Sequence, residues 1–420
     1  MDFALFLSFR PRSLRAPPAP HKETPMITPA DLKRVRSLPE DACVLMAVVH
    51  VNPADQENHG GALTTRVKSA LNDLGVPPTL AGRLLDDLAR AREARGRSAV
   101  YVLGEGGVDE RFDVQLDLPE RFHFGRPLPA LVEHAAHALP RVGVLAVDRD
   151  WARFFVFEQG ELGEVRRERN TEIDGLDRDG LTASTTAVPG APGAARAQDG
   201  SGFSPQGTGP RSDSGAEFFQ RHLDALQQRF YNETAEQLAR ELKDRDLAHL
   251  ILVGPVARLA EFRAELPATA PFEVIGETNV ELGTGSAPEQ TITDRLRPLV
   301  EDFARRDETR LMAQLQEEGV LEMERVLELV QQGRVYQLVI PEDGSQMHLY
   351  RSHNPEVPYF TARKDVTESP LDGSLMERVT LEELLPSLQE LYGLEVRRVH
   401  GEHAEKLVKE YGGLAGLARY

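Results

Sequence analysis

The sequence predicts an α/β fold of three domains, each a mixed sheet with flanking helices. Short continuous apolar runs, which are typical of buried strands, alternate along the 420 residues with segments whose apolar residues recur at helical spacing. Two stretches, residues 166–215 and 277–307, lack the apolar pattern of the rest. Because 40% of the residues are hydrophobic, the chain has enough apolar side chains for several cores.

Residues 26–138 are predicted to form an N-terminal α/β domain. Thr28, with Asp31 three residues on, is a helix start signal. Cys43, the one cysteine, precedes an apolar run, and we expect a buried structural thiol rather than a nucleophile. His134 and His137 stand three apart in a predicted helix with no evident third metal ligand, so a partly exposed helix is favoured over a metal site. The expected strands and helices are CVLMAVVHV, TTRVKSALNDLGV, PTLAGRLLDDLARAREARG, SAVYVLG, RFDVQLDL and PLPALVEHAAHAL.

Residues 139–276 are predicted to form a central domain. Three strands, read from RVGVLAVDRDWARFFVFEQGELGEVRR, come first, and the polar turn Asp148–Arg149–Asp150 joins two of them. A loop rich in glycine, proline and serine follows over residues 166–215. A long helix, a strand, a helix that ends before Pro267 and a last strand complete the unit: AEFFQRHLDALQQRFYNETAEQLARELKDRD, LAHLILVGP, VARLAEFRAELP and FEVIGE.

Residues 277–307 are predicted to be a connector that becomes helical, and residues 308–420 a compact α/β/α sandwich. Gly319 and Gly333 are expected to stop its first two helices. The piece from 343 to 375 is expected to be irregular and polar. Thr380 and Glu383 form a capping box for the next helix. A strand, a helix and the closing LAGLARY then follow.

Composition excludes several classes of function. A net charge of −18 argues against non-specific coating of nucleic acid. This net charge does not exclude one local basic patch. No apolar run approaches the roughly 18 residues of a membrane helix, and we expect a soluble protein of a reducing cytoplasm. In residues 1–25 the basic residues follow the apolar piece, the reverse of a signal peptide. We expect this segment to be disordered or to precede a natural start at Met26, with targeting as the lesser alternative.

Motifs for phosphate loops, dinucleotide binding, serine nucleophiles and zinc are absent from the sequence, which predicts neither a cofactor nor a metal. The order of the parts carries more information. The stretch VGVLAVDRDWARFFVFEQGELGEV, the glycine-rich loop, the long helix and LILVGPVARLAEFRAELP resemble the central domain of archaeal and eukaryotic class 1 release factors and Pelota. They are more similar still to the bacterial archaeo-eukaryotic-type release factors. GRVYQLVIPE and VHGEHAEKLVKEYGGLAGLARY resemble the final domain of those factors.

This resemblance covers residues 27–420 and implies finer expectations. The central domain would be ribonuclease H-like, and the last domain would be of the kink-turn RNA-binding type. In catalytic members the central loop carries Gly-Gly-Gln, or a variant with glycine, an aromatic residue, serine and glutamine, and enters the peptidyl-transferase centre. The loop there promotes hydrolysis of the peptidyl-tRNA ester.

The matching residues in this chain are Gly202, Phe203, Ser204 and Gln206. The resemblance implies catalytic roles for Gly202, Ser204 and Gln206, with the glutamine N–H stabilising oxyanion charge and its side chain orienting water. Ser201 splits the two glycines and Pro205 stands before the glutamine, so a linker with an incidental glutamine is the alternative. Gln198 is a second, poorer candidate. The implied RNA contacts are Phe203, Arg211, Arg221, Arg397, Arg398 and Lys406, whereas a solvated, salt-bridged surface is the alternative for the basic residues.

Residues 26–138 show no codon-reading signature, which argues for a role independent of stop codons. The first hypothesis is a bacterial, cytoplasmic release or rescue factor that hydrolyses peptidyl-tRNA on stalled ribosomes or large subunits. The alternative is a non-hydrolytic binder of the ribosomal A site during stalling or dormancy. Expected partners are large-subunit rRNA and peptidyl-tRNA, with a translational GTPase as a further candidate and neither membrane nor DNA. An unrelated α/β adaptor or nucleotidase-like protein is the third hypothesis.

Overall fold

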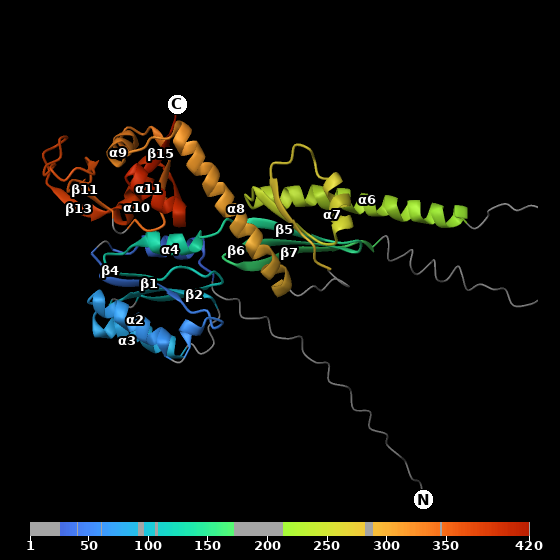
Figure 1. The fold of residues 1–420 in the computed structure, drawn as a ribbon, viewed down its shortest axis with the longest axis horizontal. Coiled ribbons are helices and arrows are strands. Elements are labelled where there is room, and N and C mark those ends of the chain that lie inside the picture. The colour runs from blue at the N-terminus through green and yellow to red at the C-terminus, as the bar shows by residue number, and fades with distance from the viewer. Residues whose placement is uncertain are drawn as a thin grey trace, which may run out of the picture.

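The computed structural model describes the following residues: 26–39, 41–59, 61–90, 96–105, 108–171, 213–281, 289–344 and 347–419. Within them the strands form sheets of four, five, three and three strands, with helices between (Figure 1). The mixed α/β class predicted from the sequence is therefore confirmed. The finer types, ribonuclease H-like and kink-turn-protein-like, stay predictions.

The first unit is an antiparallel sheet with helices on both faces, in the order β3-β2-β1-β4. Leu45, Ala47 and Val49 of β1 pack with α2 and α3, while Val44, Met46 and Val48 pack with α1 and α4 (Figure 1). The continuous apolar run is thus explained by burial on both faces. The elements are α1 (Pro29–Arg36), β1 (Val44–His50), η1 (Gln56–Asn58), α2 (Ala62–Asp73), α3 (Pro78–Arg90), β2 (Ser98–Gly104), β3 (Asp109–Val114), β4 (Arg121–Gly125) and α4 (Pro129–Ala136).

The second unit is a five-stranded sheet in the order β7-β6-β5-β8-β9. Its first three strands are an antiparallel meander, whereas β8 and β9 run parallel to β5. Tyr231, Leu238 and Phe262 of α6 and α7 bury one face of the sheet. The elements are β5 (Val142–Val147), β6 (Trp151–Glu158), β7 (Glu161–Arg169), α6 (Asp213–Asp244), β8 (His249–Val253), α7 (Val256–Ala264) and β9 (Glu273–Thr278).

Helix α8 (Glu289–Glu318) joins the second unit to the third without a break. Its first half packs Ile292, Leu296 and Val300 on the other face of the five-stranded sheet. Its second half contributes to the core of the third unit through Leu311, Met312 and Leu315. The boundary expected between 307 and 308 therefore lies inside this helix, because its apolar spacing continues across that point.

The third unit has a main sheet in the order β14-β10-β15, with β10 and β14 parallel and β15 antiparallel to β10. The expectation of irregular chain over 343–375 is wrong in part, because β11 and β12 lie there and pair in a separate small sheet with β13. The elements are α9 (Met323–Gln331), β10 (Val335–Pro341), β11 (His348–Ser352), β12 (Phe360–Thr361), β13 (Met376–Thr380), α10 (Leu381–Tyr392), β14 (Glu395–Val399), α11 (Gly401–Tyr411) and β15 (Ala415–Ala418).

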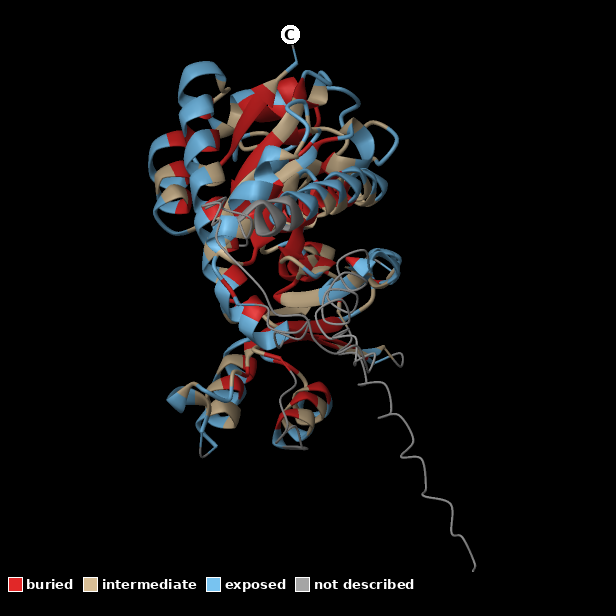
Figure 2. Cartoon of the chain, turned by 90° about the vertical axis from the view of Figure 1, so that its right-hand side faces the viewer, coloured by how far each residue is buried: buried red, intermediate tan, exposed pale blue. Residues whose placement is uncertain are grey.

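Buried residues gather along the strands and on the inner sides of the helices (Figure 2). Cys43 is not among them: the thiol expected to be buried is exposed. The physical reason is its position. Strand β1 begins only at Val44, so Cys43 lies in the segment that precedes the strand and outside its buried apolar run.

The turn between β6 and β7 locks the first unit to the second. Gln159, which is 4% exposed, accepts a hydrogen bond from Ile27 N at 3.0 Å and donates one to Ile27 O at 2.8 Å. Gly160 has φ of 81°, and a Cβ on it would lie 2.4 Å from the backbone oxygen of Gln115. Only glycine satisfies both the left-handed backbone and this close approach.

Gly160→Ala is expected to lower the free energy of unfolding by at least about 1–2 kcal/mol, the cost of a left-handed non-glycine residue, with the clash adding to it. Urea denaturation measures this effect. Gly163→Ala is the matched control, because its nearest non-neighbouring atom, Val156 O, would lie 3.9 Å from the new Cβ. Equal stability of the two variants would contradict the prediction.

Candidate functional site

The candidate loop lies between β7 and α6, and residues 172–212 fall outside the described residues. The predicted residues Gly202, Phe203, Ser204, Gln206 and Arg211 are all in that stretch. The structure does define both ends of the loop. Strand β7 leads into it through Asn170, and α6 begins at Asp213 after it.

Asn170 ties the first end of the loop to the turn between β5 and β6. It is 4% exposed, and its backbone N donates to Asp150 O at 2.8 Å. Its side-chain Nδ2 donates to Arg149 O at 3.4 Å. The predicted polar turn between hairpin strands is confirmed, because β5 and β6 pair antiparallel on either side of it.

The same turn is tied to α6, the helix at the other end of the loop. Tyr231 of α6 is 1% exposed and donates from its hydroxyl to Asp148 O at 3.2 Å. Its ring packs edge-on against Phe262 at a centroid distance of 5.6 Å. One short turn therefore positions the strand that enters the loop and the helix that leaves it.

Asp148 makes this turn rigid. Its Oδ1 accepts backbone hydrogen bonds from Asp150 N at 2.8 Å and Trp151 N at 2.7 Å. Burial raises the pKa of the Asp148 carboxyl, although these two N–H donors act in the opposite direction. Burial likewise raises the pKa of Tyr231, so its hydroxyl stays protonated at neutral pH and remains a donor.

Asp148→Asn is expected to be more stable than the wild type at neutral pH. An asparagine Oδ1 can accept the same two N–H groups, and it removes a carboxylate whose ionised form is disfavoured by burial. Since the folded pKa of Asp148 lies above its unfolded value, the wild type loses stability as the pH rises through that titration. The advantage of the variant should therefore shrink towards acid pH.

Urea unfolding on both sides of the carboxyl titration measures this difference. Asp150→Asn is the comparison in the same turn: its side chain is exposed, and because its charge also raises the pKa of Asp148, a smaller gain of the same sign is expected. An advantage of Asp148→Asn that does not change with pH would contradict the proposed cause.

The basic residues predicted to contact RNA are not brought together. Arg221 lies on α6, which projects away from the third unit (Figure 1). Arg398 donates from its two Nη atoms to the two carboxylate oxygens of Glu382, both at 2.7 Å, and its side chain is 13% exposed. Arg397 pairs with Asp307, and Lys406 lies half-buried over the Tyr411 ring. In the third unit these residues are therefore engaged within the fold rather than in one open basic patch.

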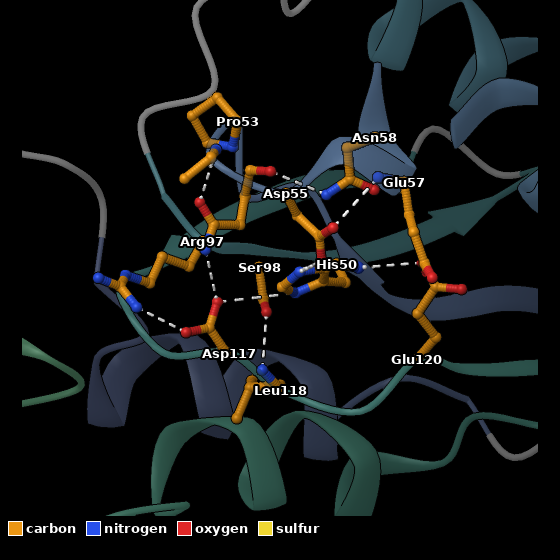
Figure 3. A network of polar contacts seen from close by, with 12 residues as sticks. His50, Pro53, Asp55, Glu57, Asn58, Arg97, Ser98, Asp117, Leu118 and Glu120 are labelled. Carbon is orange, nitrogen blue, oxygen red and sulfur yellow. Dashed lines mark hydrogen bonds and ion pairs between the residues drawn. The ribbon is translucent and has the colours of Figure 1, made fainter. Parts of the chain in front are cut away.

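A polar network at the end of β1 was not anticipated from the sequence (Figure 3). His50 Nε2 lies 3.2 Å from Asp55 Oδ2, and its Nδ1 lies 3.8 Å from Asp117 Oδ1. Hydrogen bonds from Arg97 and Asn52 outweigh burial and lower the pKa of Asp117. These residues satisfy one another's hydrogen-bonding groups and hold the segment after β1 in place.

The structure also reveals crevices between the first unit, α8 and the third unit. The larger, of about 610 Å³, is lined by His134 of α4, Glu308 of α8 and His400 before α11. A second crevice of about 470 Å³ shares these three residues. His134, expected on a partly exposed helix, is only 6% exposed, because it follows Leu131 on the apolar face of α4. His137 is exposed.

No cluster of three or more His, Cys, Asp or Glu side chains within the described ranges is arranged to hold a metal ion. Among the helices that the structure describes, none is long and apolar enough to cross a bilayer.

Residues 128–299 match the model of the bacterial archaeo-eukaryotic release factor family 10. This part of the chain is similar to the bacterial archaeo-eukaryotic release factors. The match covers less than half of the 420 residues and spans the five-stranded sheet, the loop and the first part of α8. It confirms the predicted resemblance.

Several solved structures are similar to this chain. The archaeal translation termination factor aRF1 is 16% identical, with 93% of this chain and 96% of that chain covered and a TM-score of 0.21. Archaeoglobus fulgidus Pelota is 14% identical, with coverage of 77% and 79% and a TM-score of 0.30. S. cerevisiae Dom34 is 11% identical, with coverage of 80% and 81% and a TM-score of 0.38. At identities and TM-scores this low, these likenesses do not bear on activity. No curated protein matched the chain.

Proposed function

We propose that this chain is a ribosome-associated factor of translation termination or rescue. In finer terms, it promotes hydrolysis of the peptidyl-tRNA ester on stalled ribosomes or large subunits, independently of stop codons. The observation that carries the proposal is the release-factor family match over residues 128–299, which includes the loop between β7 and α6. The common anchoring of both loop ends to the Asp148–Trp151 turn supports it, since it gives a long loop a defined origin.

The proposed chemistry belongs to the loop and its RNA surroundings. Gly202 permits close backbone approach to RNA, Ser204 and Gln206 stand at the reacting ester, and the Gln206 N–H stabilises developing oxyanion charge. The Gln206 side chain orients or crowds the attacking water. No protein general base is required if RNA and substrate supply the remaining groups.

The proposed partners are large-subunit rRNA and peptidyl-tRNA in the cytoplasm, with a translational GTPase as a candidate for delivery. Phe203, Arg211 and Arg221 are the proposed RNA contacts around the loop. In the third unit, Lys406 and Arg397 are better placed than Arg398 to contact RNA. A phosphate contact by Arg398 would have to break its two hydrogen bonds to the buried Glu382 carboxylate.

The second candidate is a non-hydrolytic factor that occupies the ribosomal A site during stalling or dormancy. The loop sequence favours it in one respect. Ser201 separates Gly200 from Gly202, and Pro205 displaces Gln206 by one residue from the family's glycine-aromatic-serine-glutamine variant. Such a loop could occupy the peptidyl-transferase centre without aligning a water.

Peptide release is measured on stalled ribosome–nascent-chain complexes and on isolated large subunits that carry peptidyl-tRNA. Gln206→Ala is expected to lower the release rate by about 100-fold, the effect of losing alignment at a reacting centre. Ribosome binding, scored by co-sedimentation of the same samples, should stay unchanged. Gln198→Ala is the matched control, because it removes the other glutamine of the loop.

Binding without release in every protein would contradict the hydrolytic function and support the second candidate. Equal release by Gln206→Ala and the wild type would contradict the role of Gln206. Absence of both binding and release would contradict both candidates.

A further inference from the structure

Helix α4 of the first unit packs against the third unit. Ala130 of α4 is part of the same apolar core as Leu384 and Leu385 of α10. One turn further along, the His134 ring faces the His400 ring, with centroids 5.6 Å apart and planes tilted by 32°. His134 is 6% exposed, and within the described residues its ring makes no hydrogen bond.

The groups around His134 are cationic or already paired. The charges that act on it are those of Arg121 of β4, Arg398 of β14 and His400. The nearby carboxylates hold other partners: Glu308 Oε1 lies 2.7 Å from His400 Nδ1, Glu382 holds Arg398, and Asp307 pairs with Arg397. On α4 itself, Glu133 pairs with Arg36 of α1 at 2.6 Å. The smaller crevice is also lined by His137, His249 and Glu395. The further titratable or charged residues that line the larger crevice are Asp117, Glu301, Arg305, Glu402 and His403.

A proton on His134 would therefore add a buried charge beside two guanidinium groups, while Glu308 and Glu382 are already held by His400 and Arg398 and no carboxylate is among the groups that act on the charge of His134. Burial, followed by Arg121, Arg398 and His400, lowers the pKa of His134 well below its ordinary value of 6.5. Once the two units separate, water solvates the ring and its ordinary pKa returns. The closed arrangement thus binds fewer protons than the open one, and acidification favours opening.

The surroundings allow such a separation. His134 lies between crevices of about 610 and 470 Å³, so the packing of α4 on the third unit is open on both sides of the His134–His400 contact, and Ala130 is the apolar contact that opening must break. The first unit stays attached to the second through the two hydrogen bonds between Gln159 and Ile27. Those bonds contain no group that titrates near neutral pH, so protonation acts on the contact with the third unit and leaves this attachment intact.

We propose that the His134–His400 contact is a proton-sensitive latch between the first and third units, closed while His134 is neutral and opened when it binds a proton. The latch does not depend on whether the loop acts on esters. It gives the chain a device that changes the relative position of two units without altering the fold of either.

Electron spin resonance distance measurements can test the latch on the full chain. Cys43 is the one cysteine, it is exposed, and it lies in the first unit. Glu410→Cys places a second label on the exposed side of α11. Nitroxides on both sites report the separation of the two units from about pH 8 to about pH 5, and circular dichroism follows the fold in the same samples.

The wild-type latch should show one distance at high pH and a second, longer distance at low pH. Each pH unit below about 6.5 should raise the open-to-closed ratio by up to about tenfold, until the closed form titrates. His134→Gln should keep the short distance throughout, whereas His137→Gln, the exposed neighbour on the same helix, should respond like the wild type. Arg121→Gln should weaken the response, because it removes a cation whose charge acts on His134.

A wild-type distance that stays unchanged over this range, with the fold intact, would overturn the latch. So would opening of His134→Gln at the same pH as the wild type, since the titrating group would then lie elsewhere. Should His134→Gln fail to fold, the Arg121→Gln comparison decides, and a response equal to that of the wild type would overturn the proposed cause.

Discussion

Helix α8 contributes apolar side chains to two separate cores, and the relation between the second and third units depends on this sharing. Ile292, Leu296 and Val300 bury one face of the five-stranded sheet, while Leu311 and Leu315 pack into the third unit. A helix holds its residues in a fixed geometry along its whole length. The two units therefore cannot move far apart unless α8 bends, and Pro298, which lies inside it, is the position with a missing backbone donor.

The first unit is attached in a different way. It meets the second unit through the Gln159–Gly160 turn and the third unit through α4, and neither contact is a continuous helix. The contact of α4 with the third unit contains one small apolar side chain, Ala130, besides the two imidazoles, and the contact with the second unit consists of hydrogen bonds at one turn. Both are weaker than the apolar packing that α8 contributes to two cores. The architecture thus combines one rigid joint with two weaker ones, and the latch uses one of the weaker ones.

The loop proposed to act on peptidyl-tRNA starts from a rigid base. The Asp148 carboxylate holds its turn through two backbone donors, Asn170 fixes the end of β7, and Tyr231 fixes α6. A long loop that enters an RNA cavity benefits from such a base, because its reach and direction are then set by the fold. The degenerate glycine-aromatic-serine-glutamine stretch and this anchoring are independent features, so a mutation can separate catalysis from positioning.

Local information in the sequence was sufficient to predict most of the helices and strands. The run at β1, the capping boxes at Thr28 and Thr380, and the Asp148–Asp150 turn follow from side-chain period and backbone chemistry within a few residues. The release-factor resemblance was also readable, because it depends on the order of such elements. The exposure of Cys43 was not predicted, because the sequence does not fix the first residue of β1 to within one position.

Only tertiary structure decided which distant residues meet. The pairing of Arg398 with Glu382 and the contact of His134 with His400 depend on how units far apart in sequence pack, and neither leaves a local pattern. The sequence predicted a boundary before residue 308, whereas helix α8 continues across it. The two halves of this helix contribute apolar residues to different cores, and the sequence alone does not show which core a residue joins. The sequence by itself determined the elements and the candidate loop residues, whereas long-range packing determined which polar groups are buried, paired or free to titrate.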